Sequence, residues 1–203
     1  MLRILNSAFL LFFLVHMVGF VFRFLKTPYH TIIMATGIIG ILLTGIVYLL
    51  IKERGKAVYS FATFGWGLYL IAVVKFLPQT YFLITAILLT GIAVIFIIKS
   101  KKVYLLHLVF AGFLFVSSTV LALTPQDNRY YLLNFTLSLH VDQDYRSWDK
   151  YSWFLYINGK KDEAKAANNK ALEIVESSDN DAMKSLIRQH YELLKQDNWK
   201  SYR

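Results

Sequence analysis

Hydrophobic positions along the chain form five long runs, which stop abruptly before a more polar tail. Each run holds about 18 to 22 mostly apolar residues, enough to cross a bilayer of about 30 Å as a helix rising 1.5 Å per residue. The polar breaks between the runs are short, so neighbouring helices are expected to pack as an up-and-down bundle. We therefore predict five transmembrane helices, near Ile4–Phe22, Thr31–Ile51, Ala57–Leu77, Tyr81–Ile98 and Val103–Leu123.

Small residues recur every fourth position inside these runs. Thr36, Gly40 and Thr44 follow one such spacing, and Thr63 with Gly67 repeats it. Small side chains let two membrane helices approach closely. The spacing predicts tight helix packing in this part of the chain.

The tail after Thr124 consists of shorter segments, in which apolar residues recur at helical spacing and polar turns separate one segment from the next. "TPQDN" suits the end of one helix and the start of the next. Asp179 or Asn180 is a suitable N-cap for the last helix. The pattern predicts three soluble helices, over Asp144–Ile157, Lys161–Glu176 and Asp181–Lys195.

One tail segment, Leu133–Val141, alternates strictly between apolar and polar residues. That alternation is typical of a half-buried strand, but a helix covered on two sides gives the same pattern. A lone strand would leave its edges unpaired, so we favour a helix. The fold class is all-α, with a five-helix transmembrane domain over 1–124 and a soluble helical domain over 125–203.

Composition agrees with a membrane protein, since 56% of the 203 residues are hydrophobic and 17% are charged. Up to Thr124 the one acidic residue is Glu53, so the whole net charge of +9 lies beside the hydrophobic runs. Cations placed this way indicate membrane topology and argue against nucleic-acid binding. The absence of cysteine excludes disulfides, thiolate metal sites and a cysteine nucleophile.

The distribution of Lys and Arg favours a cytoplasmic N-terminus. With five crossings the tail then lies outside, which in a bacterial inner membrane is the periplasm. Seven cations would lie inside and four outside. The inner set is Arg3, Lys52, Arg54, Lys56, Lys99, Lys101 and Lys102, and the outer set is Arg23, Lys26, Lys75 and Arg129.

Three ionisable residues of the predicted spans are candidates for intramembrane chemistry. His16 lies near the middle of the first span, where an imidazole can hydrogen-bond to a neighbouring helix, bind a metal or pass a proton. Packing is the favoured role, because no second His or carboxylate lies near it in sequence. His107 is expected at the membrane interface. Lys75 is close enough to a helix end to extend to the headgroups.

Sequence motifs give no support for an enzyme. The chain contains no metalloprotease, nucleophile-elbow, phosphate-loop or dinucleotide motif. No Asp or Glu falls at mid-membrane depth, where ion-coupled carriers commonly place one. We predict no catalytic residue, no cofactor and no metal.

The tail resembles a tetratricopeptide repeat between about residues 145 and 176. That family places a Trp early in the first helix, a small residue four positions later, a Gly in the turn, and alanines and a Leu in the second helix. The matching residues here are Trp148, Ser152, Gly159, Ala164, Ala171 and Leu172. The chain departs from the pattern at Asn168, where the family has an aromatic residue, and at Glu176, where it has a proline.

This resemblance implies binding of proteins or peptides. The leading hypothesis is a membrane-anchored interaction or assembly protein, with membrane or periplasmic proteins, the bilayer and a second copy of the chain as partners. One repeat is fewer than the three usually needed, so we expect a partner or the flanking helices to complete the core of the tail. The alternatives are a small transporter or transporter subunit, and an enzyme acting through His16 or His107. Candidate contact residues are Tyr145, Trp153, Tyr156 and Tyr191.

Overall fold

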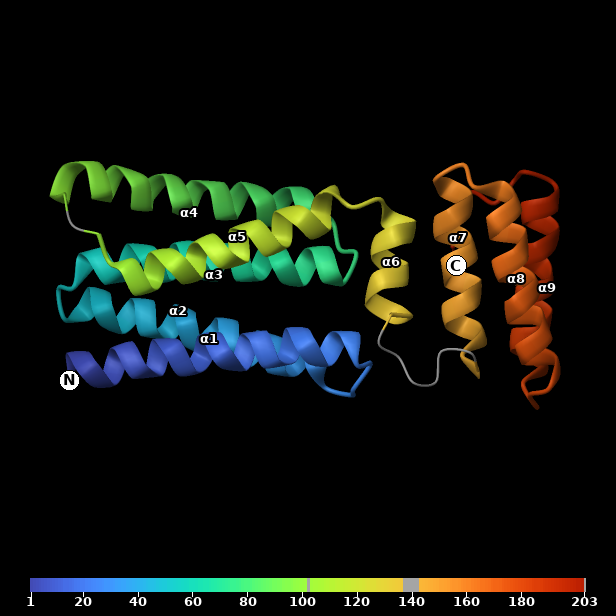
Figure 1. Ribbon diagram of the computed structural model, residues 1–203, viewed down its shortest axis with the longest axis horizontal. Helices are drawn as coiled ribbons and strands as arrows, with labels where there is room; N and C mark the ends of the chain where they lie inside the picture. The colour runs from blue at the N-terminus through green and yellow to red at the C-terminus, as the bar shows by residue number, and fades with distance from the viewer. Residues whose placement is uncertain (102, 137–142, 203) are drawn as a thin grey trace. The chain divides into compact units, whose positions relative to one another are not determined.

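The computed structural model describes residues 1–101, 103–136 and 143–202, and these residues form α-helices and no β-strand. The all-α prediction is therefore confirmed for them. The chain divides into two compact units, Met1–Leu123 and Thr124–Arg203. The first unit contains α1 (Leu2–Phe24), α2 (His30–Leu50), α3 (Arg54–Val74), α4 (Gln79–Ser100) and α5 (Leu105–Leu123), shown in Figure 1.

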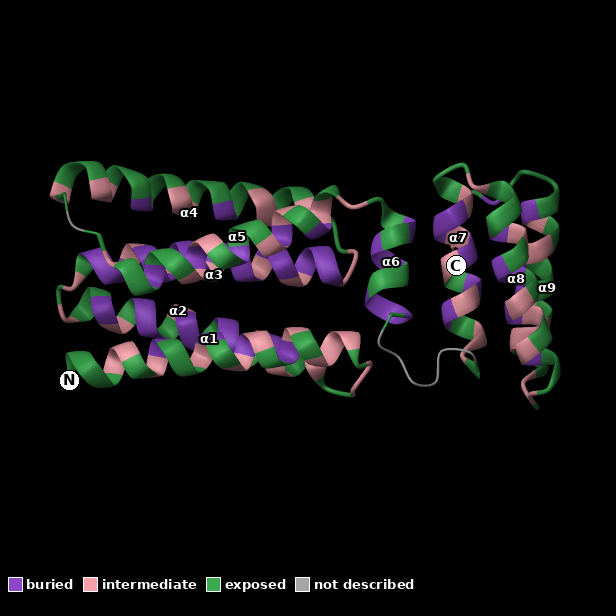
Figure 2. Cartoon of the chain, in the orientation of Figure 1, coloured by how far each residue is buried: buried purple, intermediate pink, exposed green. Residues whose placement is uncertain are grey.

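The five helices of the first unit are long and apolar enough to cross a membrane. They run up and down, with α3 in the middle of the bundle (Figure 1). In the most apolar stretch of each helix, 72% of the residues are buried in α3, whereas 11% are buried in α4. Figure 2 shows the difference as a mostly buried α3 beside a mostly exposed α4. Because the exposed surface of α4 is apolar, it is compatible with a lipid environment.

Glycine brings α1 and α2 into close contact. A Cβ atom at Gly40 would overlap the ring of Phe12, and one at Gly37 would overlap the backbone at His16. Thr44, in the same spaced set, turns its hydroxyl back to the Gly40 carbonyl at 2.8 Å. The small residues therefore serve helix packing, as their spacing predicts.

The third span begins and ends three residues earlier than its hydropathy indicates. The sequence places it over Ala57–Leu77, whereas α3 extends over Arg54–Val74. The residues of the "KERGK" break that follow Glu53 form the first turn of the helix. Lys56 consequently lies inside the bundle, with 8% of its surface exposed.

The second unit contains α6 (Gln126–Asn134), α7 (Tyr145–Ile157), α8 (Lys161–Glu176) and α9 (Asp181–Lys195). Asp144 caps α7 by accepting a hydrogen bond from the Ser147 amide, and Asn180 caps α9 through the Met183 amide. Gly159 makes the turn between α7 and α8 with φ of +78°, a conformation that glycine adopts without strain.

The alternating segment Leu133–Val141 is only partly within the described residues. Leu133 and Asn134 end α6, and Phe135 with Thr136 forms a turn. Residues 137–142 lie outside the described part of the chain. A continuous helix from Leu133 is therefore not observed, because the helix stops at Asn134.

The helices of the second unit pack around two small apolar clusters. Leu155 of α7 and two alanines of α8, Ala164 and Ala167, pack beneath Leu194 of α9 and the indole of Trp199. A second cluster joins Ala171 and Val175 to Ile187. The hairpin of α7 and α8 is thus covered by α9 and the segment after it.

Candidate functional site

His16 holds two helices together inside the first unit. The side chain is fully buried, and its Nδ1 lies 2.9 Å from the Met34 carbonyl of α2. Because a carbonyl can only accept, Nδ1 carries the proton and donates. Nε2 has no hydrogen-bond partner among the described residues. Among the described residues, no group of three His, Cys, Asp or Glu is arranged to hold a metal ion.

Lys56 is the centre of a polar cluster at one end of the bundle. Its Nζ donates to Asn6 Oδ1 at 3.2 Å, and the Tyr48 hydroxyl donates to the same oxygen at 2.8 Å. Nζ also lies 5.8 Å from the ring centroids of Tyr48 and Tyr104. The cation is stabilised by an amide oxygen and two aromatic faces, since no carboxylate in the described residues pairs with it.

His107 lies beside this cluster, with its ring stacked on Phe9 at a centroid distance of 4.2 Å and at 5.7 Å from the Tyr48 ring. The side chain is 2% exposed, and its Nε2 has no hydrogen-bond partner among the described residues. His107 therefore packs against aromatic rings inside the helix bundle.

Lys75 directly follows α3 at the opposite end of the bundle and contacts His30 at the start of α2. Nδ1 of His30 lies 2.9 Å from the Thr27 carbonyl and donates to it, which leaves Nε2 as an acceptor. The Lys75 ammonium donates to that Nε2 at 3.1 Å. Partial burial lowers the pKa of Lys75, and the nearby positive charge of Arg23 lowers it further.

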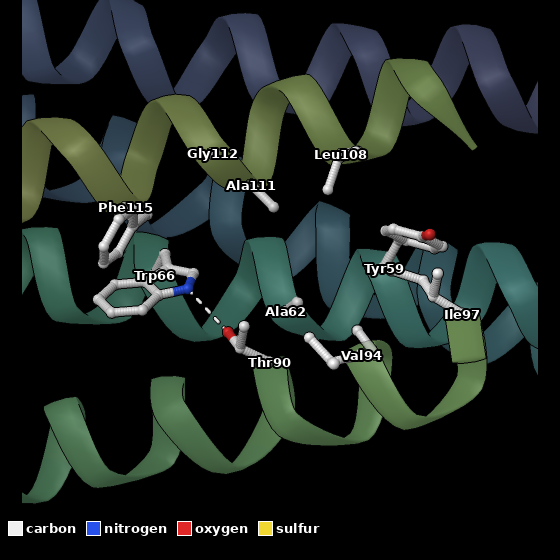
Figure 3. A pocket seen from close by; sticks show the side chains of 11 residues that line it. Tyr59, Ala62, Trp66, Thr90, Val94, Ile97, Leu108, Ala111, Gly112 and Phe115 are labelled. Atoms are coloured by element: carbon white, nitrogen blue, oxygen red, sulfur yellow. Dashed lines mark hydrogen bonds between the residues drawn. The ribbon is translucent and has the colours of Figure 1, made fainter. Parts of the chain in front are cut away.

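A cleft of about 200 Å³ lies between α4 and α5, with α3 as its floor (Figure 3). The two helices each pack on α3 and make few contacts with each other. Buried side chains of α3 form the floor, and exposed side chains form the rim. The floor residues are Tyr59, Ala62 and Trp66, and the rim residues include Val94, Leu108 and Phe115.

One aromatic pair closes the cleft halfway along the bundle. Trp66 and Phe115 meet edge to face, with centroids 4.7 Å apart. The Trp66 indole donates to the Thr90 hydroxyl at 2.9 Å, as Figure 3 shows, and this bond fixes the ring against α4. A second hollow of about 390 Å³ begins on the other side of the pair and extends to Leu123.

The second unit buries a polar network around Asp149. Its carboxylate accepts hydrogen bonds from Asn168 Nδ2 at 3.0 Å, from His190 Nδ1 at 2.9 Å and from the Tyr202 hydroxyl at 3.0 Å. Asp149 and Asn168 are fully buried and His190 is 3% exposed. The Trp199 indole stacks on the His190 ring at 4.7 Å. The network joins α7, α8, α9 and the end of the chain, and its burial indicates a structural role.

Asn168 and the small residues singled out by the sequence lie between α7 and α8. Asn168, which stands where the pattern has an aromatic residue, donates from Nδ2 to the buried Asp149 carboxylate of α7 at 3.0 Å. Ser152, at the small-residue position, hydrogen-bonds to the Asp149 carbonyl at 2.7 Å. The small residues Ala164 and Ala171 are fully buried between the helices.

A groove of about 340 Å³ lies over α7 and α8 of the second unit. Trp148, Tyr151 and Leu155 line it from α7, and Ala166 and Ala167 line it from α8. Two charged residues of α8, Glu163 and Lys170, complete the lining. The groove is therefore apolar at its centre and carries an acid and a base two helical turns apart.

The four predicted contact residues do not meet in this groove. Trp153 and Tyr156 lie against Trp199, at centroid distances of 5.2 and 6.1 Å. Tyr145 packs against the cluster of Ala171, and Leu172 lies beside it. Tyr191 is partly exposed on α9. The structure therefore places three of the four against the core of the unit.

Sequence reasoning missed the two polar clusters for different reasons. Lys56 lies in a charged break between two apolar runs, so the sequence pattern assigns it to solvent. Its hydrogen-bond partner, Asn6, is 50 positions away, and no local pattern predicts such a contact. Asp149 and His190 lie on helices with a clear stripe of apolar residues. A polar residue on such a stripe is the one sequence feature that could have predicted a buried polar network. For Asn168, the corresponding feature is an amide at a position where the tetratricopeptide pattern has an aromatic residue.

Comparison of the chain with protein-family models, with curated proteins and with solved structures returns no match.

Proposed function

We propose that the protein is a membrane-anchored interaction protein whose second unit holds a segment of another protein at the membrane surface. The five apolar helices of the first unit supply the anchor, in a bacterial inner membrane with the second unit in the periplasm. The observation that carries the proposal is the groove over α7 and α8. It presents the half-exposed aromatic side chains of Trp148 and Tyr151, a residue type that protein-binding surfaces favour.

The groove favours a segment with an apolar side chain flanked by charges. Trp148, Tyr151 and Ala167 offer an apolar centre to one anchor residue. Glu163 lies near one end of the groove and favours a basic residue of the partner there. The tetratricopeptide resemblance supports the same function, because repeats of that kind bind peptides through their helix surfaces.

The test compares two single substitutions on neighbouring exposed positions of α8. Ala166 lines the groove, whereas Asn169 is exposed and outside its lining. The full chain is purified in detergent, and the proteins that accompany it are identified and quantified. Ala166→Arg is expected to remove a partner that Asn169→Arg retains, because an arginine at position 166 occupies the groove.

Loss of the same proteins from both variants, or from neither, would contradict the proposal. The transporter alternative makes the opposite prediction for the two units. Deleting residues 125–203 would then leave function intact while His16→Ala abolishes it. The membrane-facing geometry gives that alternative little support, since the described spans bury no carboxylate and His16 is committed to the Met34 carbonyl.

A further inference from the structure

The cleft between α4 and α5 has the shape of a site for a long apolar group. Its floor is buried, with Ala62 and Trp66 at 3% and 5% exposure, and its rim opens to the outside of the bundle along two exposed helices. The side chains around Gly112 leave space: a Cβ atom there would meet nothing within 4 Å. An acyl chain is long, thin and apolar, and it fits such a cleft through dispersion contacts.

A polar group marks one end of the cleft. Tyr59, which is 1% exposed, lines the cleft, and its ring meets the ring of Tyr104 edge to face at a centroid distance of 5.8 Å. Figure 3 shows this ring at the end near Ile97, away from Trp66. The phenol therefore places a polar group at this end of a mostly apolar lining.

The same end of the bundle carries most of its positive charge. The connection from α2 to α3 and that from α4 to α5 lie together there (Figure 1). In these connections and the adjoining helix ends, the described residues include one acid, Glu53, and five cations, of which Lys56 is buried: Lys52, Arg54, Lys56, Lys99 and Lys101. Such a cluster at a membrane surface attracts anionic headgroups.

We infer that the cleft binds one acyl chain of an anionic phospholipid, whose headgroup lies at the Lys99 and Lys101 end of the bundle. The inference rests on the membrane placement of the first unit and is independent of the partner of the second unit. The chain would extend from Tyr59 to the Trp66–Phe115 pair, which closes the cleft at mid-depth.

The experiment uses the full chain in nanodiscs that contain phosphatidylglycerol with a photoactivatable group near the end of one acyl chain. After irradiation, the labelled peptides are identified by mass spectrometry. Labelling is expected to concentrate around Trp66, Val94 and Phe115. Lipid that contacts the bundle without a site would label the exposed outer surface of α4 equally.

Two glycines provide a matched pair of variants. Gly112 lines the cleft, and Gly91 of α4 lies outside its lining; at both, an added Cβ meets open space. Gly112→Leu is expected to lower labelling in the cleft about fivefold, which corresponds to the loss of roughly five to ten carbon–carbon contacts. Gly91→Leu is expected to leave it unchanged.

A second arm tests the headgroup. Replacing both Lys99 and Lys101 by Gln is expected to remove the preference for phosphatidylglycerol over phosphatidylcholine in the same nanodiscs, with cleft labelling by the neutral lipid retained. Uniform labelling of the outer surfaces, or equal labelling of the Gly112→Leu and wild-type clefts, overturns the site. A preference that survives the lysine replacements overturns the anionic headgroup. Labelling spread over all the spans would still show that the first unit lies in the membrane. The experiment can therefore contradict the lipid site without contradicting the membrane anchor.

Discussion

At the scale of single residues, Asp149 ties the second unit together. One carboxylate accepts hydrogen bonds from three side chains that are 19, 41 and 53 positions away in sequence. A buried carboxylate is tolerated only when its oxygens are satisfied, and its partners are equally dependent on it. The network therefore fixes which faces of α7, α8 and α9 meet.

Replacing Asp149 by Ala is expected to destabilise the second unit by about 3 kcal/mol, because it leaves buried donors of Asn168 and His190 without an acceptor. Unfolding of the full chain in detergent can be followed by tryptophan fluorescence, since three of the four Trp residues lie in this unit. Asp162→Ala removes an exposed carboxylate and should cost about 0.5 kcal/mol or less. Equal losses for the two variants would contradict a structural network.

Tyr202 gives the network a dependence on alkaline pH. Burial raises the pKa of this phenol above its ordinary value of 10.0, and the negative charge of Asp149 raises it further. A raised folded-state pKa contributes stability that is present below pH 10 and is lost as the pH rises above it. Tyr202→Phe should lower stability at neutral pH and flatten the alkaline decline. Denaturant titrations of both proteins at several pH values check this, and parallel declines would refute it.

At the scale of elements, the sequence predicts the soluble helices better than the membrane helix ends. Asp144 and Asn180 are side-chain caps next to clear apolar stripes, so α7 and α9 begin where the pattern places them. The start of α3 is different. Arg54 and Lys56 belong to a charged stretch that the pattern assigns to solvent, yet the Asn6 amide oxygen and two aromatic rings hold Lys56 inside the bundle. The cleft has no local signature, since it arises where α4 and α5 pack separately on α3.

The turn between α7 and α8 provides a prediction about one element boundary. Gly159 has φ of +78°, and an added Cβ would meet nothing within 4 Å, so backbone strain is the whole cost of a side chain there. Gly159→Ala should destabilise the second unit by about 1 kcal/mol. Gly159→Asn should cost less, because asparagine tolerates this conformation. Unfolding by tryptophan fluorescence ranks the two variants, and the reverse order would contradict the argument.

At the scale of the whole molecule, charge is divided between the two parts of the chain. The net charge of +9 belongs to the part up to Thr124, and the tail carries as many acids as bases. Bacterial inner membranes keep basic loops in the cytoplasm and let neutral segments cross. The proposed topology therefore places the connections around Lys52 and Lys101 inside and the second unit outside.

The absence of cysteine makes this topology directly testable. Lys52 and Ser201 are both exposed, and each can be replaced by Cys in a chain with no competing thiol. In intact cells with a permeabilised outer membrane, a maleimide that cannot cross the inner membrane should label Ser201→Cys and spare Lys52→Cys. Lysed cells should label both, which controls for accessibility. Labelling of Lys52→Cys alone in intact cells would reverse the orientation, and with it the compartment in which the groove of the second unit meets its partner.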